Sequence, residues 1–473
     1  MFQVTAAFCA GLNDEGGTGP VKDKKNASTA EERLKEALVP KEEQPYELPG
    51  NWAWVRLGSV IELISGRDAA LIDCNNMAVG IPYILGASNI ENNTFLVERW
   101  IENPQVVSRK GDILLSVKGT IGKIYIQQEN FINISRQIMA IRLFKQLNSL
   151  YVYYFFKYIC DELREAGNGL IPGISRKEIL EKKIPFSPLA EQKRIVERIE
   201  GLFSKLDEAK ELIQSSLERS QLRRSAILHA AFTGQLTEQW RKENGVDMGS
   251  WRIKKLSDCG TWLGGGTPSK SVLEYWIGGT IPWVSPKDMK SKEIVDTIDH
   301  ITEKALQNST VNLVKEPALL FVMRSGILRR TLPLALVKMS VTVNQDLRAI
   351  IPDKKEVALV YLYWVCSRYE QDIRAKCSKN GTTVESINSD ALFQYTIPLP
   401  SLPEQHEIVR ILDSLLQKED AARELCEGVL EKIELTRKSI LAQAFRGHLG
   451  TNNPNDPSAL DLLEKVFRDS STV

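Results

Sequence analysis

A long segment of this 473-residue chain occurs twice without an insertion or a deletion, and this repeat limits the possible folds more than any other feature. The first copy runs from PFSPLAEQKRIVERIE to AILHAAFTGQL, and the second from PLPSLPEQHEIVRILD to SILAQAFRGHL. Gln192 and Gln405 are separated by 405 − 192 = 213 positions, and Gly234 and Gly447 by 447 − 234 = 213. A stretch that tolerates no gap is typical of one rigid helix whose length matters.

Apolar residues inside each copy recur at alternating spacings of three and four residues. This heptad spacing predicts that two long helices pair through one apolar seam. An ordinary amphipathic helix on a globular core is the alternative, but the length and the duplication favour a helix pair. Glu419 stands where the first copy has Leu206, so the two helices are not interchangeable. The residues predicted to pair the helices are Ile195, Ile199, Leu202, Leu206, Ile213, Ile408, Leu412, Leu415, Val429 and Ile433.

The region before each helix also occurs twice, with loops that differ in length between the copies. The run IPY at Ile81 matches IPW at Ile281, and the aromatic run at Tyr151 matches that at Tyr361, so the offset drifts upward from 281 − 81 = 200. Short β-branched runs punctuated by Gly, Pro and Asn predict a mixed α/β domain in both regions. We therefore divide the chain into a charged, partly disordered N-terminal segment (1–47), a first globular domain (48–188), a central helix (189–237), a second globular domain (249–401), a distal helix (402–449) and a tail (450–473) with a short helix at 457–467.

Composition is typical of a cytoplasmic globular protein. No apolar run reaches the roughly 18 residues that a membrane span needs, and the N-terminus lacks the basic region of a signal peptide. The seven cysteines show no C-x-x-C spacing and the four histidines form no pair at helical spacing, so we expect neither a metal site nor a disulfide framework. The net charge of +1 does not by itself indicate a nucleic-acid partner, because DNA binding needs local basic surface.

Motifs for catalysis are missing from the sequence. The glycine-rich run from Gly264 to Lys270 lacks the G-x-x-x-x-G-K-[ST] spacing that cradles phosphates. The chain also has no Asn/Asp-Pro-Pro-Tyr motif of a DNA methyltransferase and no carboxylate cluster typical of a nuclease. We therefore predict a protein that is not an enzyme, with no catalytic residue and no cofactor.

Several of these segments resemble the specificity subunits of type I restriction–modification systems. The string GGTPS at Gly265, followed by EYW at Glu274 and IPWVSPKDM at Ile281, is similar to the opening of many target recognition domains in that family. The two Leu-x-Glu-Gln helix starts resemble its two conserved regions, so the resemblance extends from about residue 48 to residue 449. The first domain departs from the pattern, because ISGR at Ile64 stands where a fuller Gly-Gly-Thr-Pro is expected.

The resemblance implies a mixed α/β fold with two target recognition domains separated by two long antiparallel coiled-coil helices, as a pseudo-two-fold internal repeat. It also implies a non-catalytic subunit that binds a bipartite double-stranded DNA site, with the helices as a ruler between the half-sites. Two modification (methyltransferase) subunits and two restriction–translocation subunits would be its protein partners. A coiled-coil adaptor that joins proteins without touching DNA is the alternative, and it predicts no salt-dependent DNA affinity.

Side chains suited to DNA contact occur in the polar or glycine-punctuated loops of both domains. Arg, Lys, Asn and Gln read base edges, whereas Lys, Arg, Ser and Thr hold phosphates. Trp276 and Trp283 are expected in the domain core rather than stacked on bases. The candidate DNA-binding residues are Arg67, Lys118, Thr120, Arg136, Gln137 and Asn168 in the first domain, and Thr267, Ser269, Lys270, Lys287, Arg324, Arg329, Arg330, Asn344, Gln345, Asn380 and Thr382 in the second.

Overall fold

The computed structural model describes residues 30–91, 93–144, 147–167, 172–315, 317–379 and 384–469. The chain forms two units, of which unit 1 comprises Met1–Ala209 and Lys432–Val473, and unit 2 comprises Lys210–Glu431. Each unit holds one globular domain, the start of one long helix and the end of the other.

The globular domain of unit 1 is built from two larger sheets and three short helices. Buried apolar strands form its centre, and β9 is buried at every position. Strand β11 runs parallel to β4 and antiparallel to β8, while the other larger sheet is antiparallel throughout. The four-stranded sheet has the order β10 (Ile124–Ile126), β9 (Ile113–Ser116), β12 (Ile138–Leu143) and β2 (Ile61–Ser65). The five-stranded sheet has the order β3 (Cys74–Asn75), β7 (Trp100–Ile101), β4 (Ile81–Ile84), β11 (Phe131–Ile134) and β8 (Val107–Arg109). The remaining pairs are β1 (Ala53–Arg56) with β13 (Lys183–Phe186), and β5 (Ile90–Glu91) with β6 (Thr94–Phe95); the helices are α2 (Ser149–Tyr158), α3 (Cys160–Ala166) and α4 (Arg176–Leu180).

Unit 2 repeats this plan with different loops. Strand β22 runs parallel to β16 and antiparallel to β19, as β11 does with β4 and β8 in unit 1. One sheet has the order β15 (Gly260–Gly264), β23 (Leu347–Pro352), β20 (Ala318–Val322), β21 (Leu334–Val337) and β17 (Glu293–Ile294). The other has the order β18 (Asp299–Ile301), β16 (Ile281–Val284), β22 (Val341–Val343) and β19 (Leu313–Val314), and β14 (Arg252–Lys255) pairs with β24 (Thr396–Leu399). The helices are α6 (Glu238–Asn244), α7 (Glu303–Asn308), α8 (Leu359–Arg368), α9 (Glu370–Cys377) and α10 (Ser389–Gln394).

Matching hydrogen bonds show that the sequence repeat is a structural repeat. The hydroxyl of Tyr151 donates to the carbonyl of Pro185 at 2.6 Å, and that of Tyr361 donates to Pro398 at 2.8 Å. Both tyrosines lie on the helix that packs beneath the strand leading into a long helix. The predicted mixed α/β fold with an internal repeat is therefore confirmed.

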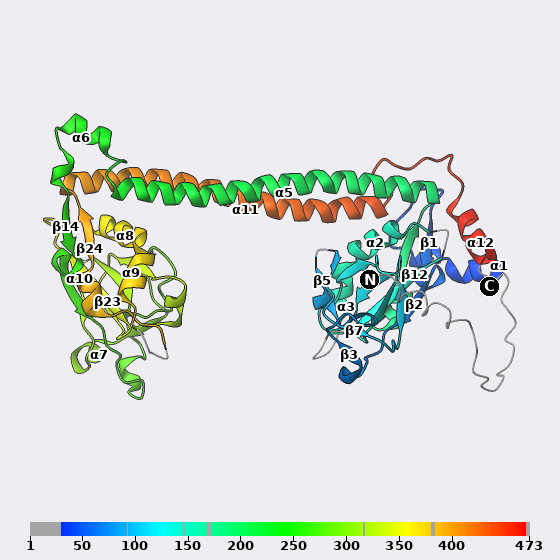
Figure 1. Cartoon of the computed structure of the whole chain (residues 1–473), viewed down its shortest axis with the longest axis horizontal. Helices are drawn as coiled ribbons and strands as arrows, with labels where there is room; N and C mark the ends of the chain where they lie inside the picture. Colours follow the sequence, from blue (N-terminus) through cyan, green and yellow to red (C-terminus); the bar gives the residue numbers. More distant parts are fainter. Residues whose placement is uncertain are drawn as a thin grey trace. The chain divides into compact units, whose positions relative to one another are not determined.

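The repeated segments form α5 (Leu189–Phe232) and α11 (Leu402–Phe445), each of 44 residues (Figure 1). At a rise of 1.5 Å per residue each helix is about 66 Å long. In unit 1 the start of α5, at Ile195, shares a core with Phe445 at the end of α11. In unit 2 the start of α11, at Ile408, shares a core with Phe232 at the end of α5. The predicted antiparallel pairing is therefore confirmed.

Side chains predicted to pair the helices differ in burial along the seam. Those near the ends lie in the apolar cores, whereas the middle of the seam is more open. Glu419, where the apolar pattern breaks, pairs with Arg223 at 2.8 Å and accepts a hydrogen bond from Ser220 at 2.5 Å. A polar contact thus replaces the missing apolar side chain. Ile195, Ile199, Ile408, Leu412 and Ile433 are buried, Leu202, Leu206, Ile213 and Leu415 are half-buried, and Val429 is 41% exposed.

A buried carboxylate at the start of each long helix holds the segment that follows the other helix. In unit 2, Glu404 is fully buried and accepts from Thr237 Oγ1 at 2.7 Å, Arg241 Nη1 at 2.6 Å and Trp251 Nε1 at 3.0 Å. In unit 1, the equivalent Glu191 accepts from Thr451 Oγ1 at 2.6 Å. These contacts fix the end of one helix against the beginning of its partner within each unit.

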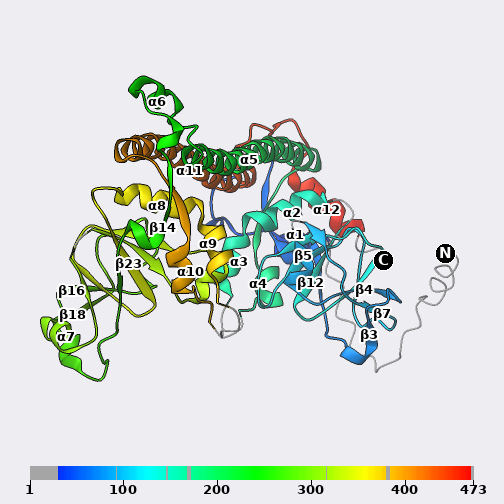
Figure 2. The same cartoon turned by 60° about the vertical axis from the view of Figure 1, so that its left-hand side comes forward.

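Two further helices belong to unit 1. α1 (Ala30–Ala37) packs against α12 (Ala459–Asp469) (Figure 2). Leu463 of α12 is buried in the apolar core of unit 1. The short helix predicted at 457–467 is confirmed. Residues 1–29, in which disorder was expected, lie outside the described residues. Among the described helices, none is long and apolar enough to cross a membrane.

Candidate nucleic-acid interface

Two loops meet at an equivalent place in each globular domain. In unit 1, the loop after β2 meets the loop that joins β11 to β12; in unit 2, the loop after β15 meets the loop that joins β22 to β23. The backbone N–H of Arg67 donates to Ile134 O at 3.0 Å, and that of Gly266 donates to Val343 O at 2.9 Å. These two bonds align the loops residue by residue, so Gly66 corresponds to Gly265.

Close backbone contact explains why a glycine is needed in both loops. A Cβ atom on Gly66 would lie 2.2 Å from the carbonyl oxygen of Ser135, and one on Gly265 would lie 2.0 Å from that of Asn344. No L side chain fits at such distances, so glycine is required here by space rather than by φ. The shortened ISGR motif of the first domain therefore retains the one glycine that the loop contact requires.

An aromatic side chain supports the first loop in each domain. The Tyr83 hydroxyl accepts from the backbone N–H of Ala69 at 3.0 Å, and the indole of Trp283 donates to Gly266 O at 3.0 Å. Burial raises the pKa of Tyr83, so its hydroxyl stays protonated at neutral pH. Trp283 is 5% exposed and its ring packs edge-on against Trp276 at 5.2 Å, which confirms the core position predicted for Trp283.

The tips of the two loops form a side-chain pair in each domain, with different chemistry. In unit 1, Asp68 accepts from the backbone N–H of Arg136 at 3.1 Å and from its Nε at 2.8 Å. In unit 2, the hydroxyl of Thr267 donates to Oε1 of Gln345. Three of these four residues were predicted from the sequence. Asp68 was not, because an acidic side chain is not a usual DNA contact and the fold alone reveals its partner.

A basic residue also occupies an equivalent place in both domains. The N–H of Val117 donates to Gln137 O at 2.8 Å, and that of Met323 donates to Asp346 O at 2.7 Å. The residues that follow, Lys118 and Arg324, are therefore counterparts, and both are exposed. The structure thus brings Arg67, Lys118, Arg136 and Gln137 together in unit 1. In unit 2 it brings Thr267, Arg324 and Gln345 together.

The remaining predicted residues have more varied surroundings. Asn344 is 5% exposed and accepts from the N–H of Asp346 at 3.0 Å, so it shapes its loop from inside. Arg329 pairs with Glu385 at 3.1 Å, and Ser269 bonds Ser271 at 2.7 Å. Exposed positions are held by Arg67, Thr120, Gln137, Lys270, Lys287 and Arg330. Asn168, Asn380 and Thr382 lie outside the described residues.

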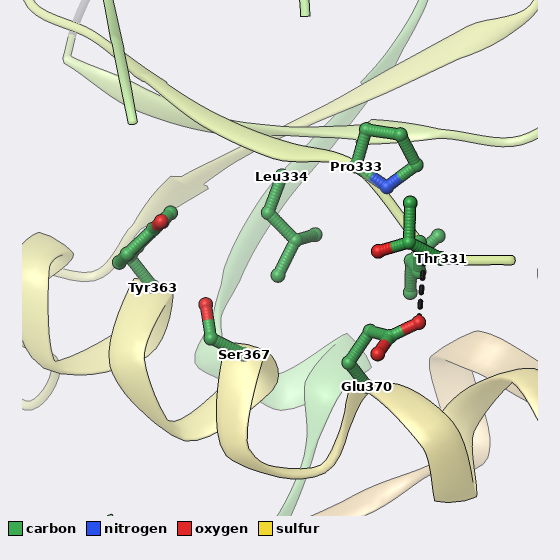
Figure 3. A pocket seen from close by; sticks show the side chains of 7 residues that line it. Thr331, Pro333, Leu334, Tyr363, Ser367 and Glu370 are labelled. Carbon is green, nitrogen blue, oxygen red and sulfur yellow. Dashed lines mark hydrogen bonds between the residues drawn. The ribbon is translucent and has the colours of Figure 1, made fainter. Parts of the chain in front are cut away.

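Figure 3 shows a hollow in unit 2 that is lined by none of these loop residues. It is bordered by the segment from Thr331 to Leu334 and by α8 and α9. Its carboxylate, Glu370, accepts from Leu332 N–H at 2.7 Å and pairs with Arg374 at 2.6 Å, so it is used in holding the segment on the helices. No group of three or more His, Cys, Asp and Glu in the described part of the chain could hold a metal ion.

Two unlike domains of one fold, each built onto an antiparallel helix pair, define a scaffold with two separate candidate interfaces. The chain belongs to the family described as type I restriction modification DNA specificity domain, whose model matches residues 49–219 and 248–434. The matched ranges contain both globular domains and most of both long helices.

Curated relatives agree with this assignment. The chain is 36% identical over 233 residues to the type I restriction enzyme EcoR124I/EcoR124II specificity subunit of Escherichia coli, covering 48% of this chain and 56% of that protein. It is 34% identical over 191 residues to the MjaIX specificity subunit of Methanocaldococcus jannaschii, covering 39% of this chain and 42% of that protein. These two matches span about half the length of each relative. The EcoDI specificity subunit of Escherichia coli matches over 454 residues at 24% identity, covering 89% of this chain and 95% of that protein.

Solved structures share the fold. A chain from a study of complex assembly and conformational transition of the type I restriction–modification system has a TM-score of 0.70 at 20% identity, covering 85% of this chain and 100% of that chain. The HsdS subunit from Thermoanaerobacter tengcongensis has a TM-score of 0.54 at 20% identity, covering 86% of this chain and 99% of that chain.

Proposed function

We propose that this chain is the DNA-specificity subunit of a type I restriction–modification complex, and that each globular domain reads one half of a bipartite double-stranded site. The loop pairs at the sheet edges carry this proposal, because they share one backbone arrangement and differ in side chains. Loops on a rigid scaffold are where binding specificity usually resides. Family membership supports the same function.

The target recognition domains in this proposal span 48–188 and 249–401. Their proposed DNA contacts are the candidate residues other than Asn344, which is buried and positions its loop. The proposed contacts, including the three outside the described residues, are Arg67, Lys118, Thr120, Arg136, Gln137, Asn168, Thr267, Ser269, Lys270, Lys287, Arg324, Arg329, Arg330, Gln345, Asn380 and Thr382.

Catalysis in the proposed complex belongs to other chains. Two modification subunits would methylate adenines and two restriction–translocation subunits would cleave, while this chain supplies no catalytic residue, metal or cofactor. The complex would act in the cytoplasm, where its DNA substrate lies. The relatives that match this chain are likewise named as specificity subunits of restriction enzymes.

Methylation mapping tests the proposal directly. The full chain is co-expressed with a type I modification subunit from the same host, and methylated adenines are mapped across the genome. We expect one motif of two unlike halves around a fixed spacer, lost when this chain is omitted. Methylation that is independent of this chain, together with no salt-dependent DNA affinity, would instead support a protein–protein adaptor.

The helix pair is proposed as the ruler between half-sites. Arg224 pairs with Asp420 at 3.0 Å in the antiparallel arrangement, so Leu217 lies level with the region of Cys426. Inserting seven residues after each of these two positions keeps the heptad seam and lengthens both helices by about 10 Å. At about 3.4 Å of rise per base pair, the spacer should grow by roughly three base pairs.

The same mapping experiment reads the outcome. The ruler predicts that both half-site sequences stay unchanged while the spacer lengthens. A control with the insertion after Leu217 alone leaves the two helices unequal and should lose specific methylation. New bases within a half-site, with the old spacer retained, would contradict the ruler.

A further inference from the structure

The loop alignment allows the two domains to be compared position by position. The carbonyls of Gln137 and Asp346 accept the equivalent backbone hydrogen bonds already described. Arg136 directly precedes Gln137, and Gln345 directly precedes Asp346. Arg136 and Gln345 are therefore counterparts. Their loop partners, Asp68 and Thr267, are counterparts as well.

Some counterpart positions carry the same chemistry in both domains and others do not, and this difference indicates different roles. Contacts to phosphate carry no sequence information, so two domains that read different sequences can share them, whereas their base contacts must differ. Lys118 and Arg324 keep a positive charge at one place, and among the described residues neither forms an ion pair. The side-chain pairs differ between the domains, because Asp68–Arg136 is ionic and Thr267–Gln345 is neutral.

The net charge of each group is a second, independent reason to separate base-reading residues from phosphate-holding residues. Asp68 neutralises Arg136, so the pair has no net charge and attracts phosphate less than the unpaired Lys118 does. The carboxylate holds the backbone N–H and Nε of Arg136, and no bond from Nη1 or Nη2 is formed with another described residue. The Arg136 side chain is 69% exposed, so the donor edge that Asp68 leaves unbound is open to solvent.

We infer that Arg136 and Gln345 are the equivalent base-reading residues of the two domains, Arg136 for a guanine and Gln345 for an adenine, while Lys118 and Arg324 hold phosphates. This inference rests on the proposed function. Two guanidinium donors match O6 and N7 of guanine in the major groove, and a glutamine amide matches N6 and N7 of adenine. Thr267 fixes Oε1 of Gln345, and a carbonyl oxygen keeps a second lone pair for the N6 amino group.

A pair exchange tests the inference. The double variant Asp68→Thr/Arg136→Gln copies the pair of unit 2 into unit 1 and leaves the net charge of the pair at zero. The control Lys118→Gln removes a charge at the neighbouring position. Full-length proteins, co-purified with the modification subunit, select from a random 40-base-pair duplex library, and their affinities are measured over a series of salt concentrations.

The exchange should change one guanine to adenine in one half-site and leave the other half-site intact. Affinity for the original site should fall about 5- to 150-fold, with an unchanged salt dependence. Lys118→Gln should weaken all sequences equally and lower the salt slope by about one, with the motif unchanged. Arg136→Lys keeps the charge but loses the rigid two-pronged geometry, so it should weaken the preference for guanine.

Two results would overturn the assignment. The first is that the pair-exchange variant selects the same motif as the wild type, whatever the affinity of the variant. The second is that the Lys118→Gln variant selects a motif different from that of the wild type. A wild-type protein that selects no sequence would overturn the proposed function itself, which separates that failure from failure of the base assignment.

Discussion

Removal of the Arg241 guanidinium should destabilise unit 2 far more than its single charge suggests. The side chain is 7% exposed and pairs with Glu404, whose side chain is fully buried. It also donates from Nη2 to the carbonyl of Gly234 at 2.6 Å. In Arg241→Met the carboxylate stays buried without its cation, and breaking a buried pair from one side costs about 3–5 kcal/mol.

This free energy corresponds to a large shift in melting temperature. Unit 2 spans Lys210–Glu431, which is 431 − 210 + 1 = 222 residues. A unit of that size loses about 2–4 °C per kcal/mol, so the midpoint should fall by roughly 6–20 °C. Differential scanning calorimetry of the full chain measures it, and Trp251, which donates to the same carboxylate, provides a fluorescence readout.

Lys242→Met is the matched control, because it is the next residue along the same helix. Lys242 pairs with Glu238 on the surface, with side chains 66% and 60% exposed. Such a pair contributes about 0.5 kcal/mol or less. If Arg241→Met melts within about 2 °C of Lys242→Met, the reasoning from burial is refuted.

Three further outcomes are expected. Burial raises the pKa of Cys259 to about 11, so at pH 8 only about one thiol in a thousand is ionised, and Ellman's reagent should label the half-buried Cys426 before the buried Cys259; equal rates for these two thiols in the native protein would contradict this. Gly201 lies inside α5 with open space around its Cβ position, so Gly201→Ala should raise the free energy of unfolding by about 0.5–1 kcal/mol in urea titrations. A loss of stability would contradict the open space around this position. The hydrogen bond from Arg223 lowers the pKa of Glu419, so the stabilisation is complete above the usual carboxyl pKa and is lost as pH falls through the lower folded value. Glu419→Gln should thus cost more stability at pH 7 than in an acid titration that passes below the usual carboxyl pKa, and a cost that stays equal throughout would refute the ionic contribution.

The helices could be predicted from the sequence because a gapless repeat leaves little freedom. A 213-residue offset holds from Gln192 to Gly234, and the heptad seam then requires a partner helix. The antiparallel direction was implied by the family resemblance rather than by the repeat, and the structure confirms it by placing Ile195 in one core with Phe445.

The loop pairs could not be predicted, because the offset changes within the domains. It is 265 − 66 = 199 at Gly66, 324 − 118 = 206 at Lys118 and 345 − 136 = 209 at Arg136, so no single alignment identifies the counterparts. Residue type alone also misled in part: Asn344 is a residue type that reads bases, yet it is turned inward and bonds Asp346.

Glu419 has a consequence for how newly made chains avoid entanglement with one another. Its partners on α5 are Ser220 and Arg223, and the corresponding positions of α11 are 220 + 213 = 433 and 223 + 213 = 436, occupied by Ile433 and Thr436. Two α11 helices from different copies of the chain would therefore place this carboxylate against an isoleucine and a threonine, with no cation. Such a mismatched dimer leaves the charge uncompensated, so α11 favours an α5 helix over a second α11, which disfavours α11–α11 dimers when many unfinished copies lie close together.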